Sequence, residues 1–433
     1  MLPLLPALGP TLRQALGGLP RSYWAIWAGI LVNRIGGFVV PFLALYLTQR
    51  LGMAVAEAGA LVSLYGLGAV GAGPVSGLLA DRLGRRAALL SSLVGGALFT
   101  ACIPFVKGPG PLGALVLATG FVGEMYRPAA QAVVGDVVPR EDRVRAFGIL
   151  YWGVNLGVAI GLVLAGVLAD VSFTLLFLGD AATSLAFAFV VWRHVPESRP
   201  DVPPEGIREA LRGLVAPLRD AVFRPFLLLH FAFAVIFFQF QLGLPVDMAS
   251  HGVSPAGFGS LMALNGVVIV VLQPLVAGRI GRVDGARAMA VGTALIGIGF
   301  GMNALHHSMA WYALAIVVWT LGEIGYLPVA STLPADLAPP ALRGRYQGAY
   351  SLSWALAFTV APALGAVVLD RLGAGALWGG SLALGLAVSA GLLATGPARR
   401  RRIEDFRAHG AGHGPDGEGP GAARSARAGP AGP

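Results

Sequence analysis

The sequence predicts an all-α membrane protein built from two six-helix bundles related by a pseudo-two-fold axis along the membrane normal. Three observations lead to this fold class: the composition is strongly apolar, the apolar runs have the length of membrane spans, and the second half repeats the first. Of the 433 residues, 56% are hydrophobic and 12% are charged, and the mean hydropathy is +0.72. Soluble domains carry about 25% charged residues.

Twelve apolar runs are long enough to cross a bilayer, which takes about 20 residues of helix. Backbone groups in lipid need partners within their own segment, so these runs must be helical. They lie at 24–47, 57–80, 87–106, 111–138, 146–168, 173–192, 225–246, 254–278, 288–306, 308–335, 346–369 and 374–396.

An internal repeat with a shift of 200 residues relates the two halves. Because six is an even number, both bundles keep the same orientation, and such halves move against each other around a midplane site in secondary transporters. The repeat is clearest after the fourth and tenth spans, where six residues recur: Pro128, Asp136, Pro139, Arg143, Arg145 and Gly148 match Pro328, Asp336, Pro339, Arg343, Arg345 and Gly348.

The basic charge predicts the orientation of the chain rather than a nucleic-acid partner. The net charge is +9. The predicted outer loops hold Arg50, Lys107 and Arg371, the spans hold Arg34 and Arg127, and the other 26 of the 31 basic residues lie in the remaining segments. This asymmetry predicts a multi-pass protein of the inner (plasma) membrane with both termini in the cytoplasm.

Outside the bundles we expect three further segments. We predict a cytoplasmic N-terminal segment at 1–20, bundles at 21–192 and 225–396, a linker at 193–224 and a disordered tail at 397–433. The linker begins rich in proline and then becomes amphipathic, which predicts a short helix on the membrane surface. The first twenty residues lack the features of a cleavable signal peptide. With one cysteine, Cys102, no disulfide can form within the chain.

The loop "GLLADRLGRR", residues 77–86, resembles the signature between spans two and three of the major facilitator superfamily. "PREDRVRAFG" at 139–148 and "LFLGDA" at 176–181 resemble its bacterial drug:H⁺ antiporter and sugar-exporter branch. The resemblance implies a latch in which Asp81 pairs with basic residues and a helix N-terminus; the alternative is a loop whose charges only set topology. The latch residues are Gly77, Asp81, Arg82, Gly84, Arg85 and Arg86, with Arg143 and Arg145 as the expected partners of Asp81.

Two features depart from that branch. In "GVAIGLVLAG", residues 157–166, Leu162 replaces the proline of the exporter motif in span five. An arginine that the family often carries early in span four would fall near Ala118 and is missing. The direction of transport therefore stays open.

Ionisable side chains inside spans are costly and usually face a cavity or a partner. Arg34 and Glu124 lie at matching depths in spans one and four, which line the cavity in this fold. We predict that they pair, directly or through water, with Asn33 nearby. The alternative is a static ion pair between helices.

Three more ionisable residues within spans are candidates for function. Glu323 is the repeat counterpart of Glu124, so both carboxylates are candidate proton sites; Glu323 could instead be hydrogen-bonded within its bundle. Arg127 is one turn from Glu124 and could pair with it, contact an anionic substrate group or extend towards the cytoplasm. Asp180 lies in span six, which tends to sit outside the cavity, and could be a structural partner of a backbone or hydroxyl group.

Aromatic and amide residues are the candidates for the substrate surface. Aromatic walls suit bulky amphipathic molecules, although any one aromatic side chain is more often part of helix packing. The candidates are Asn33, Tyr65, Tyr126, Tyr151, Trp152, Gln239, Gln241, Asn265, Tyr326, Tyr350 and Trp354.

The sequence argues against an enzyme. It has no P-loop, H-E-x-x-H or G-x-S-x-G pattern, and we interpret His306 and His307 as interfacial rather than metal-binding. We predict a monomeric, proton-driven antiporter without a cofactor, which exports small amphipathic compounds or drugs. The alternatives are an uptake symporter or facilitator for a metabolite, and a non-transporting membrane receptor.

Overall fold

The computed structural model describes residues 17–37, 39–139, 142–197, 215–280, 283–339 and 342–411. Within these ranges the side chains at 73, 74, 77, 78, 81, 82, 144, 274, 276–280 and 407–411 are outside the description. The described residues form helices and no strand, so the predicted all-α fold class is confirmed.

The first bundle consists of long helices joined by short connections. Its elements are α2 (Arg21–Gly36), α3 (Val39–Leu45), η2 (Tyr46–Arg50), α4 (Val55–Leu83), α5 (Arg85–Cys102), η3 (Ile103–Phe105), α6 (Pro109–Glu124), α7 (Tyr126–Val137), α8 (Arg143–Val171) and α9 (Phe173–His194).

The second bundle repeats this order after the short linker helix α11. Its elements are α11 (Val215–Arg219), α12 (Phe223–Phe237), η5 (Phe238–Gln241), α13 (Gly243–Ser250), α14 (Pro255–Ile280), α15 (Gly285–Gly301), η6 (Met302–Ala304), α16 (Met309–Leu337), α17 (Arg343–Leu372) and α18 (Ala374–Ala411).

Eleven helical segments of the described residues are long and apolar enough to cross a membrane. The predicted fourth span, 111–138, is divided at Met125 into α6 and α7, of 16 and 12 residues. Pro128 contributes to the break, because it has no amide hydrogen to donate to the carbonyl of Glu124; its repeat counterpart Pro328 lies within the continuous helix α16. Glu124 and Arg127, which have charged side chains, lie on either side of the break at Met125.

The first and seventh spans are interrupted at equivalent positions of the repeat. α2 ends at Gly36 and α3 begins at Val39, while α12 ends at Phe237 and continues as η5 and α13. The carboxylate of Asp180 accepts a hydrogen bond from the amide of Val39 at 3.4 Å. This bond satisfies an amide that has no intrahelical partner at the start of α3.

The bundles meet along two helix pairs, α4 with α17 and α8 with α14. Glycines permit the close approach. A Cβ at Gly59 would lie 2.3 Å from that of Ala366, and a Cβ at Gly259 would lie 2.3 Å from the carbonyl oxygen of Leu162. The hydroxyl of Ser63 also accepts a hydrogen bond from the amide of Ala363 at 3.0 Å.

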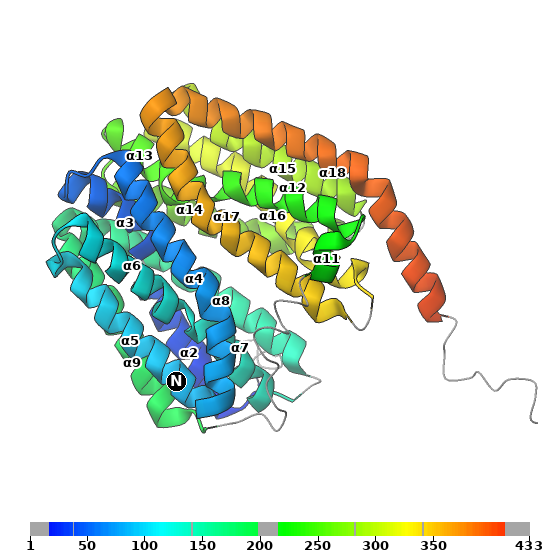
Figure 1. Cartoon of the computed structure of the whole chain (residues 1–433), viewed down its shortest axis with the longest axis horizontal. Helices are drawn as coiled ribbons and strands as arrows, with labels where there is room; N and C mark the ends of the chain where they lie inside the picture. Colours follow the sequence, from blue (N-terminus) through cyan, green and yellow to red (C-terminus); the bar gives the residue numbers. More distant parts are fainter. Residues whose placement is uncertain are drawn as a thin grey trace, which may run out of the picture.

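Figure 1 shows the bundles as two inclined groups of helices that lie close together near α3 and α13. We call this the far end, and the end carrying His194 and Val215 the linker end. One apolar core joins the two bundles at the far end, continues through the second bundle, and includes Phe42 and Phe258, whose ring centroids are 5.5 Å apart. The linker half of the first bundle has a separate core around Tyr23 and Phe187.

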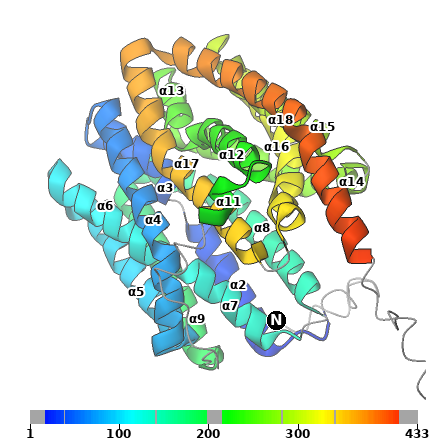
Figure 2. The same cartoon turned by 45° about the vertical axis from the view of Figure 1, so that its right-hand side comes forward.

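The C-terminal helix is longer than predicted, and in both views α18 extends beyond the second bundle (Figures 1 and 2). The prediction of disorder for 397–433 is wrong for 397–411, which continue α18. Arg399 donates to the carbonyl of Leu392 at 2.8 Å, and Arg402 pairs with Asp220 at 2.8 Å. These contacts hold a segment whose composition alone suggested disorder. Most of the predicted linker helix lies outside the described residues.

Candidate functional site

A cavity of about 270 Å³ lies among the helices of the first bundle and reaches the second bundle. The second bundle contributes Phe240, Gln241, Met262 and Phe358 to its wall. The polar lining of the cavity is concentrated in the first bundle, and its ionisable, amide and phenol side chains are Asn33, Arg34, Tyr65, Glu124, Tyr126, Arg127 and Asp180.

Arg34 projects from the last turn of α2 into this cavity. Its guanidinium donates a hydrogen bond to the hydroxyl of Tyr126 and lies 5.5 Å from the centroid of the same ring. Its Nε atom is buried without a hydrogen-bond partner. The cation is thus held on an aromatic hydroxyl at the wall of the polar cavity, whereas the sequence predicted a carboxylate as its partner.

Glu124 has two partners, and neither is Arg34. The hydroxyl of Tyr65 donates to its carboxylate at 2.8 Å, and Arg127 pairs with it at 2.5 Å. The predicted direct pair between Arg34 and Glu124 is therefore wrong, because no contact within 4.0 Å joins them in the described structure. The (i, i+3) spacing across the break at Met125 places Arg127 nearer to the carboxylate.

The sixth span contributes to the cavity, contrary to what the resemblance implied. Asp180 and Ser184 of α9 both line it. Asn33 donates to the hydroxyl of Ser184 at 2.9 Å, and Asp180 accepts from the amide of Val39. The structure thus gives Asp180 the backbone partner that was one of its two predicted roles.

Gln241 is the polar residue that the second bundle places at the cavity. Its side chain is 1% exposed, and neither amide atom has a hydrogen-bond partner. Gln239 differs, because its amide nitrogen donates to the carbonyls of Val235 and Ala361 at 3.2 Å each and serves helix packing. A buried amide without partners is costly and suits a contact with a bound polar group.

Three predicted substrate contacts, Tyr326, Tyr350 and Trp354, are not in the cavity wall. They surround His230, which is fully buried on α12. His230 shares a hydrogen bond with the hydroxyl of Tyr326 at 3.0 Å and stacks on Tyr350 with centroids 4.3 Å apart. The prediction missed this cluster, although a lone histidine in an apolar span was a signal for it.

The remaining predicted contacts also lie away from the cavity wall. Tyr151 and Trp152 on α8 are 53% and 50% exposed. Asn265 donates to Glu323 and to the hydroxyl of Thr320, at 2.9 Å each. Glu323 is therefore hydrogen-bonded within its own bundle, which was the alternative considered for it.

The predicted latch lies where α4 meets α5. The expectation of a loop at 77–86 is wrong, because residues 77–83 belong to α4, Arg85 and Arg86 begin α5, and Gly84 alone separates the two helices. The side chains of Asp81 and Arg82 are outside the described residues, so the latch stays a prediction. Gly84 has a φ of +100°. Next to it the carboxylate of Glu197 accepts hydrogen bonds from the amides of Arg86 at 2.9 Å and Ala87 at 3.1 Å, at the start of α5. Anions are stabilised at helix N-termini.

The other basic latch residues have partners within the first bundle. Arg85 pairs with Asp136 and donates to the carbonyl of Ala132. Arg145 pairs with Asp142 at 3.1 Å, and Arg143 donates to the carbonyl of Val138 at 3.3 Å. The pairs of Asp136 with Arg85 and of Glu197 with Arg86 were not predicted, because these residues are far apart along the chain; Glu197 and Arg86 are 111 positions apart.

One histidine of the pair at 306–307 is not isolated. His307 lies with Asp247 and His251 at the far end of the second bundle, and ligand atoms of the three residues are within 4.8 Å of one another. The interpretation of His306 and His307 as interfacial did not take Asp247 and His251 into account. The fold brings α13 next to the loop before α16, which the sequence distance concealed.

The family model of the major facilitator superfamily matches residues 26–248 and 242–428. The chain belongs to the major facilitator superfamily. It is 26% identical to the uncharacterised transporter YttB of Bacillus subtilis, over 83% of this chain and 91% of that one. It is 26% identical to a Na⁺, Li⁺, K⁺/H⁺ antiporter of Planococcus maritimus (75% and 84% covered) and to the multidrug resistance protein MdtH of Klebsiella pneumoniae (72% and 78% covered).

Solved structures of superfamily transporters share the fold. A POT family transporter in complex with 5-aminolevulinic acid superimposes with a TM-score of 0.75 at 18% identity, covering 89% of this chain and 98% of that one. The nucleoside transporter NupG, as a mutant, gives 0.74 at 13% identity, covering 86% and 98%. This superfamily protein is a multi-pass secondary transporter of small molecules and not an enzyme.

Proposed function

We propose that this transporter is a proton-coupled antiporter that exports small amphipathic compounds across the bacterial plasma membrane by alternating access. The observation that carries the proposal is Glu124, an ionisable carboxylate in the cavity wall with Tyr65 and Arg127 as its partners. Acidic residues within membrane helices mark ion pathways and proton relays more often than structural sites.

The two side chains of the Glu124–Arg127 ion pair differ in their exposure to water. The side chain of Glu124 is 17% exposed, whereas that of Arg127 is 52% exposed. Arg127 can therefore leave the carboxylate for water or for an anionic substrate group. Movement of Arg127 away from Glu124 is therefore the step by which we propose that opening of the cavity is coupled to proton uptake.

The cavity wall indicates the chemical class of the cargo. Phe240, Met262 and Phe358 supply an apolar surface on the second bundle, and Tyr65 and Tyr126 supply aromatic faces on the first. Gln241 offers an unpartnered amide. Binding sites for small molecules combine a mostly apolar wall with a few placed polar groups, which suits a small amphipathic compound.

The names of two relatives, each 26% identical to this chain, support antiport. One is a cation/proton antiporter and another is a multidrug resistance protein. If the linker end faces the cytoplasm, as the basic residues predict, contact between the bundles at the far end corresponds to closure on the outer side. We propose that Asp81 and the adjoining ends of α4 and α5 act as the latch of the opposite state.

The test measures protons directly. Everted vesicles containing the protein would be energised, and substrates from a toxic-compound panel would be added while the internal pH is followed with a fluorescent dye. We expect substrate-induced proton release with the wild type and no release with Glu124→Gln. Glu57→Gln is the matched control, because Glu57 is exposed at the start of α4.

Two results would reject the proposal. Export that continues undiminished after a protonophore collapses the gradient would exclude proton coupling. Proton release in Glu124→Gln equal to that of the wild type would exclude Glu124 as its site. Addition of Na⁺, Li⁺ or K⁺ in place of organic compounds tests inorganic cations as the cargo.

Uptake of a metabolite is the second candidate function. It is favoured by Leu162, which replaces the proline of the exporter motif and lines the cavity. Radiolabel flux in intact cells decides between the two, since an exporter lowers the accumulation of its substrate and an uptake system raises it.

A further inference from the structure

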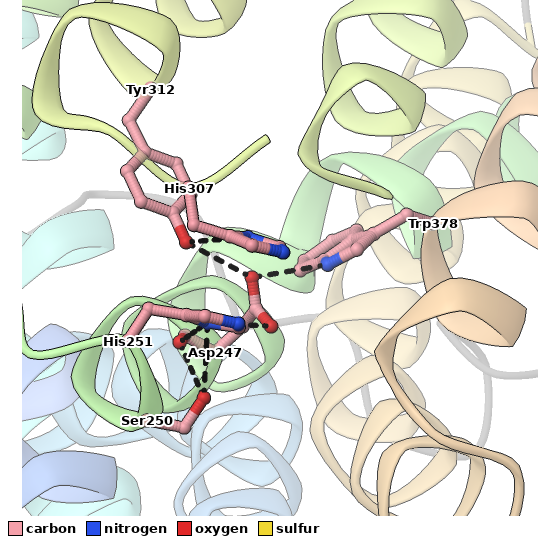
Figure 3. Close-up of polar contacts among 6 residues, drawn as sticks. All are labelled: Asp247, Ser250, His251, His307, Tyr312 and Trp378. Carbon is pink, nitrogen blue, oxygen red and sulfur yellow. Dashed lines mark hydrogen bonds and ion pairs between the residues drawn. The ribbon is translucent and has the colours of Figure 1, made fainter. Parts of the chain in front are cut away.

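We propose that Asp247, His251 and His307 form a binding site for a divalent transition metal at the far end of the second bundle. Figure 3 shows the three side chains converging from α13, the turn after it and the loop before α16. A ring nitrogen of each histidine and a carboxylate oxygen of Asp247 all lie within 4.8 Å of one another.

The carboxylate is buried and only half satisfied. Asp247 is 1% exposed. Its Oδ2 atom accepts hydrogen bonds from the hydroxyl of Tyr312 at 3.4 Å and the indole of Trp378 at 3.3 Å. Its Oδ1 atom is buried without a hydrogen-bond partner, and Nδ1 of His251 lies 3.7 Å from it. A buried anionic oxygen without a partner is costly, and a bound cation would remove that cost.

The hydrogen bonds leave the same nitrogen free on both histidines. In His251, Nδ1 lies 2.8 Å from the backbone carbonyl of Asp247, which only accepts, so Nδ1 carries the hydrogen. In His307, Nδ1 lies 3.3 Å from the hydroxyl of Tyr312, whose one hydrogen goes to Asp247, so Nδ1 again donates. Each Nε2 therefore keeps its lone pair, and such Nδ1 bonds orient metal-ligating histidines in proteins.

The rings need a small movement to bind one ion. They stack with centroids 3.5 Å apart and planes at 14°, so their lone pairs lie in two nearly parallel planes and do not converge on one point between the rings. Ligands of a tetrahedral ion lie about 3.3 Å apart, and a rotation of the side chains would bring the atoms to that spacing. His251 is exposed and His307 is half-buried in a loop, so both have room to turn.

Two imidazoles and one carboxylate select borderline divalent ions such as Zn²⁺ or Co²⁺, with a fourth position left for water. A bound ion would join α13 to the loop before α16. Since α13 also contacts α3 of the first bundle, the ion would rigidify the segment next to the far-end contact between the bundles.

The experiment uses the full chain purified without a histidine tag, in a background with His409→Ala and His413→Ala so that these two histidines do not contribute. Co²⁺ is titrated while its visible absorption is recorded, and Zn²⁺ binding is measured by calorimetry. We expect one ion per chain, and at least a tenfold loss of affinity in His251→Ala and in His307→Ala. His306→Ala is the matched control, being the exposed neighbour in the same loop.

The proposal is overturned if neither ion binds at 1 mM, or if one histidine variant binds as tightly as the background chain. Equal losses in His306→Ala would also overturn it. Size-exclusion profiles of the variants confirm folding, and the two substituted positions in a turn and a loop leave the buried carboxylate in place. Because binding is measured without transport, the result is independent of the proposed antiport.

Discussion

At the scale of single residues, tyrosine hydroxyl groups are the hydrogen-bond partners of two charged side chains in the cavity of the first bundle. Tyr126 receives the guanidinium of Arg34, and Tyr65 donates to Glu124. Both tyrosines are almost fully buried. Arg34 thus shares one cavity with the ion pair of Glu124 and Arg127 without contacting the carboxylate itself.

The first prediction concerns the partner of Glu124. Arg127→Ala should lower the melting temperature, because it leaves a largely buried carboxylate without its cation. Adding Glu124→Gln to that variant should recover at least half of the loss. The measurement is a double-mutant cycle by thermal unfolding in detergent.

A parallel cycle with Arg34→Ala serves as the comparison. We expect a smaller coupling energy between Arg34 and Glu124, because no direct contact joins them. A larger coupling for Arg34 than for Arg127 would contradict the geometry.

At the scale of elements, Asp220 ties three helices together at the linker end. Its carboxylate accepts from the amides of Val222 at 2.8 Å and Phe223 at 3.0 Å, and so caps α12. It also accepts from the hydroxyl of Tyr346 on α17 and pairs with Arg402 on α18. Burial raises the pKa of Asp220, but the hydrogen bond from Tyr346, the two amides and Arg402 outweigh burial and hold the pKa below its ordinary value.

The second prediction follows from the sign of that shift. A carboxylate with a lowered pKa in the folded state stabilises the fold above its unfolded pKa of about 3.9, and this stabilisation is lost as the pH falls through the folded pKa. Asp220→Asn should therefore melt at a lower temperature than the wild type at pH 5–7, and the difference should shrink below about pH 4. Melting curves of both proteins between pH 7 and pH 3 test this, and a difference independent of pH would contradict it.

At the scale of the whole molecule, the far-end contact is the feature that alternating access must break. Gly59 brings α4 close to α17 and Gly259 brings α14 close to α8. The bond between Ser63 and Ala363 lies in the seam between α4 and α17. Transport by bundle movement requires this seam to open once in each cycle.

The third prediction uses that seam as a lock. In a Cys102→Ser background, Ser63→Cys with Ala363→Cys should form a disulfide on oxidation and reduce transport at least tenfold. A reductant should restore it, and each single cysteine variant should be unaffected. Full transport by the oxidised, cross-linked protein would show that α4 and α17 do not separate there.

Hydropathy and the repeat predicted the two bundles, and the equivalent breaks after Gly36 and Phe237 agree with that repeat. The charged residues of the cavity were also predicted, because an arginine or glutamate within a span is costly in lipid and usually faces a cavity or a partner. The partner of Glu124 was predicted as Arg34, with Arg127 as a further possibility, because depth in the membrane does not specify which helix face a side chain occupies. The structure shows the ion pair with Arg127.

By itself, the sequence determined the membrane class, the duplicated bundles and the presence of Arg34, Glu124 and Asp180 at membrane depth, because the cost of burying polar groups in lipid acts on each segment separately. Only the tertiary structure decided that Tyr65 donates to Glu124, that Tyr326 packs on His230 and that His307 meets Asp247. Those contacts join segments through the rotation and packing of whole helices, which the composition of a single segment does not encode.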